Sequence, residues 1–125
     1  MSVQTGSSLV TEWRELLARK HRVAEALERD LQREHRLSVM EFEVLQRLSE
    51  HDDDGCRLQS LLDDIHMSQS ALSRLIGRLA DEGLVERRSC SDDRRGIYAM
   101  LTDEGRQRLA AAEPTHLAVL EKTLR

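Results

Sequence analysis

Apolar side chains recur at the three- and four-residue spacing of an α-helix along most of this chain. The longest periodic stretch runs roughly over residues 9–34 and predicts a helix with one apolar stripe about 100° wide. This stripe is longer than a small neighbouring module can cover. Its members are Leu9, Trp13, Leu16, Leu17, Ala24, Leu27 and Leu31.

A second helix is predicted to begin at Ser38. Ser38 and Glu41 have the spacing of a capping box, and Leu37 and Phe42 have the spacing of the accompanying hydrophobic staple. The run HDDDG then breaks the helical pattern. A short helix with a core-facing apolar side is expected over residues 58–65, followed by a turn into the next helix.

The next helix, starting at Ser68, has two unlike faces. Opposite an apolar side lie short hydroxyls, a glycine and long cations, instead of the Glu and Lys mixture of a solvated helix. Such a face favours close approach to DNA, because hydroxyls and N–H groups hold phosphates and arginine donates two hydrogen bonds to guanine. An ordinary solvated face is the alternative. The apolar side consists of Leu72, Leu75, Ile76 and Leu79, and the opposite face of Ser70, Ser73, Arg74, Gly77, Arg78 and Asp81.

A hairpin is predicted after this helix, which Gly83 is expected to cap. Residues 84–88 and 96–101 predict its two strands, and the tip between them reads SCSDDRR. Arg94 and Arg95 at the tip suit a narrow, electronegative minor groove. A solvated charged loop is the alternative. The tip follows a helix whose exposed face suits DNA, and this order of elements favours the minor-groove contact.

The last helix is expected to begin after Thr102, which can cap it, with Asp103 and Glu104 in the first turn where the helix dipole prefers acids. Pro114 lies inside the helical pattern and predicts either a kink or two helices meeting there. The apolar side consists of Leu109, Leu117, Leu120 and Leu124.

Together these elements predict a mainly α fold with a small antiparallel β-hairpin (α+β), a winged helix-turn-helix flanked by N- and C-terminal helices. We expect a single domain over residues 1–125, with a DNA-binding lobe at residues 38–102. The flanking helices at 9–34 and 103–125 carry more apolar surface than one domain needs, which indicates a dimer interface. Packing of these two helices within one subunit is the alternative.

The hairpin resembles the wing of the MarR-type transcriptional regulators. That wing typically reads aspartate and arginine, a few residues, a leucine-threonine pair and a glycine, and here the sequence is DRRGIYAMLTDEG over residues 93–105. The preceding GLVER at 83–87 also resembles the family's turn into the wing, and the order of elements agrees along nearly the whole chain. The resemblance implies a homodimer that binds a pseudo-palindromic operator, usually near its own promoter, and that a small molecule or an oxidant releases or alters. We expect the regulator to act as a repressor.

The resemblance also implies the DNA-binding residues. Arg94 is expected in the minor groove, whereas Gly77 departs from the polar or charged residue that the family usually has at its position. The positions that match the recognition helix are Ser68, Gln69, Ser70, Ser73, Arg74 and Arg78, and those that match the wing tip are Asp93, Arg94 and Arg95.

Family members often hold a ligand between the first helix and the DNA-binding lobe. In this chain Trp13, Arg14, Leu17 and His21 lie along one border of the first apolar stripe, with Arg14 and His21 about 10.5 Å apart along the axis. They are the candidate site for a small aromatic or phenolic effector. The alternative is that the arginine and histidine pack their stems at the dimer seam.

The excess of acidic over basic side chains lies in the first half of the chain. The formal net charge is -4, yet residues 55–125 carry 11 basic and 11 acidic side chains. This balance predicts local contact patches and modest nonspecific DNA affinity. Only three aromatic residues are present, Trp13, Phe42 and Tyr98, too few for the stacking platforms of single-strand binders.

Other classes of protein have weaker support. Two cysteines build no disulfide framework, and neither Cys56 nor Cys90 has metal-type spacing to a histidine, although a redox switch at Cys90 stays open. No catalytic motif or cofactor loop is present, so we expect neither an enzyme nor a cofactor or metal. No signal peptide or membrane-length apolar run is visible, so we expect a cytoplasmic protein. A winged-helix module that binds protein instead of DNA is the alternative function.

Overall fold

The computed structural model describes the backbone of residues 2–51, 56–90 and 93–125, and the side chains of residues 6–51, 56–88 and 97–125. The strands form one antiparallel sheet in the order β1-β3-β2. The predicted fold class is therefore confirmed, although the sequence pattern does not predict β1. The elements in chain order are α1 (Ser2–His35), α2 (Val39–Ser49), β1 (Cys56–Arg57), α3 (Leu58–Asp64), α4 (Gln69–Asp81), β2 (Val85–Cys90), β3 (Asp93–Leu101) and α5 (Asp103–Leu124).

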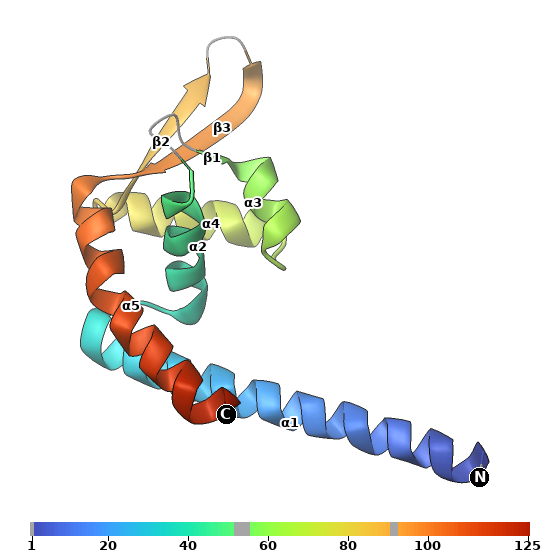
Figure 1. The fold of residues 1–125 in the computed structure, drawn as a ribbon. Helices are drawn as coiled ribbons and strands as arrows, with labels where there is room; N and C mark the ends of the chain where they lie inside the picture. Colours follow the sequence, from blue (N-terminus) through green and yellow to red (C-terminus); the bar gives the residue numbers. More distant parts are fainter. Residues whose placement is uncertain (1, 52–55, 91–92) are drawn as a thin grey trace.

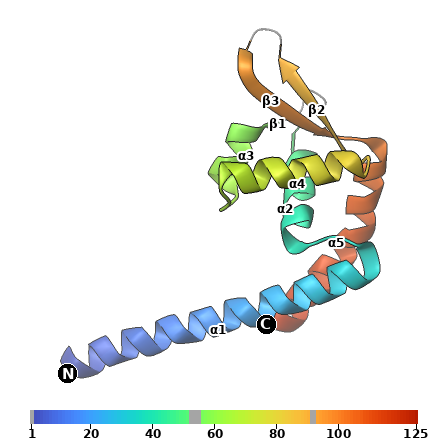
Figure 2. The same ribbon diagram turned by 180° about the vertical axis from the view of Figure 1, so that it is seen from behind.

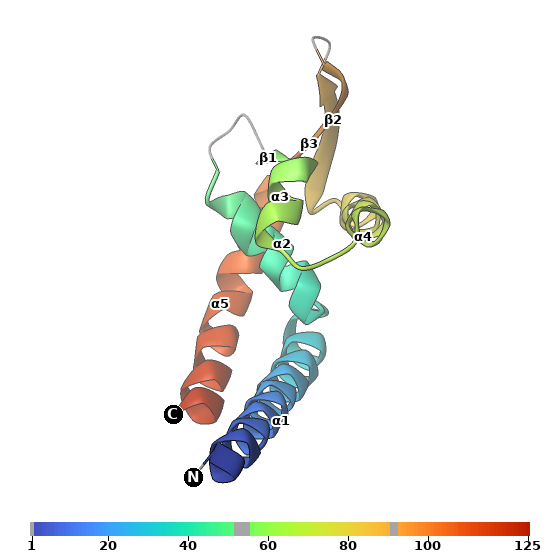
Figure 3. The same ribbon diagram turned by 90° about the vertical axis from the view of Figure 1, so that its right-hand side faces the viewer.

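The N-terminal half of α1 projects from the rest of the molecule as an arm (Figures 1 and 2). The other half lies beside α5, as Figure 3 also shows, where Leu31 of α1 and Ala112 of α5 are fully buried. The hairpin of β2 and β3 projects from the opposite end of the molecule, next to α4 (Figure 1). The two ends that project are thus the arm and the hairpin.

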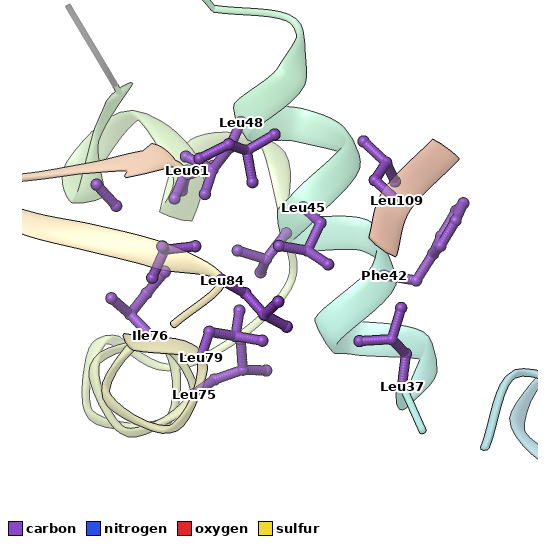
Figure 4. Close-up of a cluster of buried hydrophobic side chains, with 14 of the residues drawn as sticks. Leu37, Phe42, Leu45, Leu48, Leu61, Leu75, Ile76, Leu79, Leu84 and Leu109 are labelled. Carbon is purple, nitrogen blue, oxygen red and sulfur yellow. The ribbon is translucent and has the colours of Figure 1, made fainter. Parts of the chain in front are cut away.

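The core lies between α2, α4, α5 and the base of the hairpin (Figure 4). The apolar residues predicted to face inward from α4 are all buried, and they meet side chains such as Leu45 and Leu84. Burial of this one face fixes the rotation of α4 about its axis, because the side chains repeat every 3.6 residues. Its opposite face is consequently turned to solvent.

Three predicted helix ends are confirmed. The Ser38 hydroxyl accepts from the N–H of Glu41 at 3.0 Å while the Glu41 carboxylate accepts from the Ser38 N–H at 2.8 Å, completing the capping box. Gly83 has a φ of 79°, and the Leu84 N–H donates to the Leu79 carbonyl, as in a glycine-terminated helix. Thr102 caps α5 by accepting from the N–H of Gly105 at 3.0 Å.

Several element bounds differ from the predicted ones. The first helix starts at Ser2 instead of near Leu9, because residues 2–8 continue the helix without an apolar period. The strand β3 starts at Asp93, so the hairpin extends further toward its tip than predicted. Pro114 lies inside the single helix α5, so the two-helix alternative is wrong; the axis of α5 bends along its length (Figure 1).

The contact between α2 and α5 contains a titratable ring. His116 of α5 stacks on Phe42 of α2, with ring centroids 4.2 Å apart and planes 20° from parallel. Burial lowers the pKa of His116 below its ordinary value of 6.5, against the opposing attraction of Glu43 and Glu113. The folded protein therefore holds this imidazole neutral where an unfolded chain would protonate it.

We expect the stability contribution of this site to fall in acid. Below pH 6.5 the unfolded chain binds more protons at His116 than the folded one, so the free energy of unfolding decreases as the pH falls through 6.5 toward the lowered folded pKa. Urea unfolding of the wild type at pH 7.5 and pH 5 measures this loss. His116→Phe keeps an aromatic ring on Phe42 without a titrating group and should lose less; an equal loss in both proteins would contradict the assignment.

Candidate nucleic-acid interface

The exposed face of α4 gathers the predicted recognition residues. Its first turn starts beyond the N-cap Ser68, and the apolar residues on the opposite side anchor it to the core. Ser73 is partly exposed, and the other members are exposed: Ser68, Gln69, Ser70, Arg74 and Arg78. All six residues are therefore accessible: Ser68 and Gln69 at the start of α4, and Ser70, Ser73, Arg74 and Arg78 along the side opposite its buried residues.

Ser68 caps the start of α4, a role that the sequence alone did not distinguish from phosphate binding. Its hydroxyl accepts from the N–H of Ala71 at 3.1 Å and lies 3.3 Å from the Ser70 hydroxyl. The first backbone N–H groups of a helix have no partner within the helix and lie at its positive end. The N–H groups of Gln69 and Ser70 are therefore the better anion donors of this first turn, with Ser68 holding the helix start in position.

Arg74 and Arg78 are accessible cations. No described carboxylate forms an ion pair with either guanidinium, in contrast to Arg29 and Arg33 of α1, which both contact Asp30 within 3.4 Å. An arginine without an internal partner keeps its planar set of donors for a phosphate or a base edge. The face of α4 therefore offers guanidinium groups as well as N–H and hydroxyl donors.

Gly77 lies in the middle of this face. Outside the backbone of α4, the one described atom within 4 Å of a Cβ at this position would be the Arg87 Nη1 of β2, at 3.7 Å, which is an ordinary van der Waals separation. The packing of the chain therefore does not require glycine here, although glycine costs a helix interior about 0.5–1 kcal/mol relative to alanine. Arg87 is the residue of this surface that the sequence reading missed, since only the folded sheet brings it beside α4.

The predicted wing tip is described only in part. The backbone of β3 begins at Asp93, but the side chains of Asp93, Arg94 and Arg95 lie outside the described residues. Closer to the base, Glu86 and Arg88 form an exposed ion pair at 3.6 Å. The expected minor-groove contact of Arg94 stays a prediction, and the described backbone provides a hairpin that projects beside α4 (Figure 1).

The four candidate effector residues are exposed along α1, from its arm to just beyond it. Trp13 and Leu17 are 57% and 44% exposed, and His21 lies 3.5 Å from Glu25 of the next turn. A groove of about 440 Å³ lies nearby, between α1 and the end of α5, but none of the four lines it. The groove is mostly apolar and is lined by Leu16, Arg19, Lys20, Val23, Ala24, Leu27, Val39 and Leu124.

The described residues contain little that suggests other chemistry. Burial, with a smaller contribution from Asp64, raises the pKa of the Cys56 thiol, which disfavours the reactive thiolate. The side chain of Cys90, the alternative redox site, lies outside the described residues. Over the ranges described, no cluster of three or more His, Cys, Asp or Glu residues suits a metal ion, and no helix is long and apolar enough to span a membrane.

Comparisons with known proteins give one family. Residues 37–97 match the model of the MarR family, and no curated protein matches the chain. Among solved structures, AbsC, a MarR family transcriptional regulator from Streptomyces coelicolor, is 34% identical with a TM-score of 0.84, and the match covers 90% of this chain and 76% of AbsC.

Two further structures carry ligands of different kinds. Sco3205, a MarR family transcriptional regulator from Streptomyces coelicolor in complex with DNA, is 29% identical with a TM-score of 0.86, over 95% of this chain and 73% of Sco3205. CouR from Rhodococcus jostii, bound to p-coumaroyl-CoA, is 26% identical with a TM-score of 0.76, over 86% of this chain and 74% of CouR.

Proposed function

Because the chain belongs to the MarR family of transcriptional regulators, we propose that it binds double-stranded DNA sequence-specifically and acts as a repressor in the cytoplasm. The single observation that carries the proposal is the exposed face of α4, where Arg74 and Arg78 have no carboxylate partner among the described residues. A helix of this kind fits the major groove, whose base edges arginine can read. The complex of Sco3205 with DNA supports the same partner.

We propose that the two copies of a homodimer read the two halves of a pseudo-palindromic operator. In this arrangement residues 38–102 bind DNA, while residues 9–34 and 103–125 dimerise. The support is the apolar surface that one copy leaves open on the arm and on α5, where the exposed fractions include 62% for Leu9, 60% for Leu16 and 57% for Leu117. Exposed apolar surface of this extent is typical of an interface.

Release by a small aromatic or phenolic effector stays a prediction from the family resemblance. The residues proposed to bind it are Trp13, Arg14, Leu17 and His21 on α1. The support is that CouR, a structural neighbour, is bound to p-coumaroyl-CoA. A site that buries an aromatic ring needs side chains on several sides, and dimerisation would bring further side chains to these exposed residues.

Selection of duplexes from a random-sequence pool by the wild-type protein tests the proposal. We expect one sequence class to be enriched, and Arg74→Ala to weaken binding to that duplex by roughly 10- to 100-fold, as expected for a lost base contact of about 1–3 kcal/mol. Arg29→Ala is the matched control, since it removes an exposed arginine from α1 and should leave the affinity unchanged. Arg94→Ala should also weaken binding and make its salt dependence shallower.

The alternative is a module that binds another protein through α4. It predicts that no duplex is enriched, so no affinity exists for Arg74→Ala or Arg94→Ala to reduce. Equal binding by wild type and Arg74→Ala would contradict the role proposed for the exposed face of α4.

We further propose that the chain is not an enzyme, in keeping with the regulatory role of its family.

A further inference from the structure

The exposed face of α4 has a gap at its centre, which a side chain from another element covers. Gly77 lies one turn after Ser73, beside Arg74, and presents no side chain of its own. The guanidinium of Arg87 lies above this glycine, with its Nη1 at 3.7 Å from the position that a Cβ would take. The cationic side chain of Arg87, from the hairpin, therefore covers the one position on this face where α4 has no side chain.

The register of the sheet explains why Arg87 reaches α4. Arg87 is paired with Ala99 and lies two residues after Val85, so the three side chains share one face of the sheet. Val85 and Ala99 are buried, which shows that this face is the one packed onto the molecule. Arg87 continues that face outward, past the edge of the core, and its exposed guanidinium ends over Gly77.

The neighbouring cation has a different environment. Arg88 points to the other face of β2, where Glu86 contacts it at 3.6 Å. No described acidic side chain forms an ion pair with Arg87. The two adjacent arginines are therefore a matched pair with equal charge, one held by a carboxylate and one open toward the recognition face.

We propose that Arg87 binds a phosphate of the DNA backbone and that Gly77 provides the space in which its guanidinium lies. The inference rests on the proposed function. It adds a third DNA contact, located between the two that the family resemblance implies, which are those of α4 and of the wing tip. If α4 enters the major groove and the hairpin tip enters the adjacent minor groove, the phosphate chain between these grooves crosses the surface between α4 and the hairpin. Arg87 occupies that surface, and a guanidinium binds phosphate through paired hydrogen bonds.

A phosphate contact has a distinct signature in binding data. Arg87→Ala should weaken binding severalfold at 0.1 M salt, to both the selected duplex and an unrelated duplex. The slope of log affinity against log salt concentration should become shallower by about 0.9, the value for one lost phosphate contact. Arg88→Ala removes the same charge from the other face of β2 and should change the slope much less.

Substitutions at Gly77 test the space that it provides. Gly77→Ala should keep Arg87 in place, because the added Cβ makes only an ordinary contact at 3.7 Å, and should raise the melting temperature. Gly77→Gln should displace the guanidinium and reduce binding about as much as Arg87→Ala. The double variant Gly77→Gln, Arg87→Ala should then bind no more weakly than Arg87→Ala alone, because both changes remove one contact.

The outcomes separate this inference from the proposed function. If the wild type enriches no duplex, the proposed function fails and the inference fails with it. If the wild type binds a selected duplex but Arg87→Ala leaves its affinity and salt slope unchanged, only the inference fails. A loss confined to one base pair of the duplex, with the salt slope unchanged, would also overturn it, since that result indicates a base contact. Thermal melts check that each variant is folded.

Discussion

Of all glycine-to-alanine replacements at the described glycines, Gly105→Ala is expected to destabilise the fold most. Gly105 is buried in the first turn of α5, and a Cβ there would overlap the carbonyl oxygen of Leu84. It would also lie 3.0 Å from the Leu84 carbonyl carbon and 3.2 Å from Leu101 Cδ2. Backbone atoms cannot move aside as a flexible side chain can, so α5 or the chain at Leu84 must shift.

The hydrogen bonds at this junction would be lost with such a shift. The Leu84 carbonyl accepts from the Thr102 N–H at 3.1 Å, and the Gly83 carbonyl accepts from the Thr102 hydroxyl at 2.6 Å. We expect Gly105→Ala to lower the free energy of unfolding by roughly 3 kcal/mol or more, against a typical total of about 5–15 kcal/mol. Urea unfolding measures the loss.

Gly6→Ala is the matched control for this experiment. Apart from the backbone of α1 itself, no described atom lies within 4 Å of the Cβ that it would add to the exposed arm of α1. Its stability should equal or slightly exceed that of the wild type, since alanine favours the helix. A stability of Gly105→Ala as high as that of Gly6→Ala would show that the junction between α5 and Leu84 is looser than described.

The second large effect is expected on the arm of α1. Leu16 is 60% exposed in a single copy and borders the apolar groove between α1 and the end of α5. If this surface is covered by a second copy, Leu16→Glu places a charge in an apolar interface, where an unpaired carboxylate is strongly unfavourable. The variant should be monomeric in analytical ultracentrifugation and should remain folded.

The loss of the dimer should also reduce DNA binding. Two half-sites bound by one dimer gain about 10²- to 10⁴-fold over a single contact, because the second binding event is intramolecular. We therefore expect Leu16→Glu to weaken binding to the selected duplex by roughly 100-fold or more. Ala18→Glu introduces the same charge on the opposite side of α1 and should leave both assembly and affinity unchanged. A dimeric Leu16→Glu would place the interface elsewhere.

Local signals made much of the fold predictable. Ser38 with Glu41, Gly83, and Thr102 each define a helix end through side-chain or backbone chemistry within a few residues, and the structure confirms all three. The apolar face of α4 was likewise readable, because burial of one side follows from the helical period. The resemblance to the MarR family, carried by the wing sequence, is confirmed.

Contacts between distant residues were not predictable in this way. The strand β1 consists only of Cys56 and Arg57, and it exists because β3 lies beside it, not because of its own sequence pattern. Arg87 looks like an ordinary strand arginine until the sheet places it over Gly77. The roles of the wing-tip residues and of the effector candidates stay predictions, since they depend on partners outside a single chain.

The spacing of the half-sites in the selected duplex tests the central claim most directly. A dimer that presents two copies of α4 should protect two inverted half-sites whose centres are about one helical turn, roughly 10–10.5 base pairs, apart. Hydroxyl-radical footprinting of the wild type on the duplex enriched from the random pool measures this spacing. We predict two protected segments related by an inverted repeat. Failure to enrich any duplex, or protection of one isolated segment by a monomer, would contradict the account.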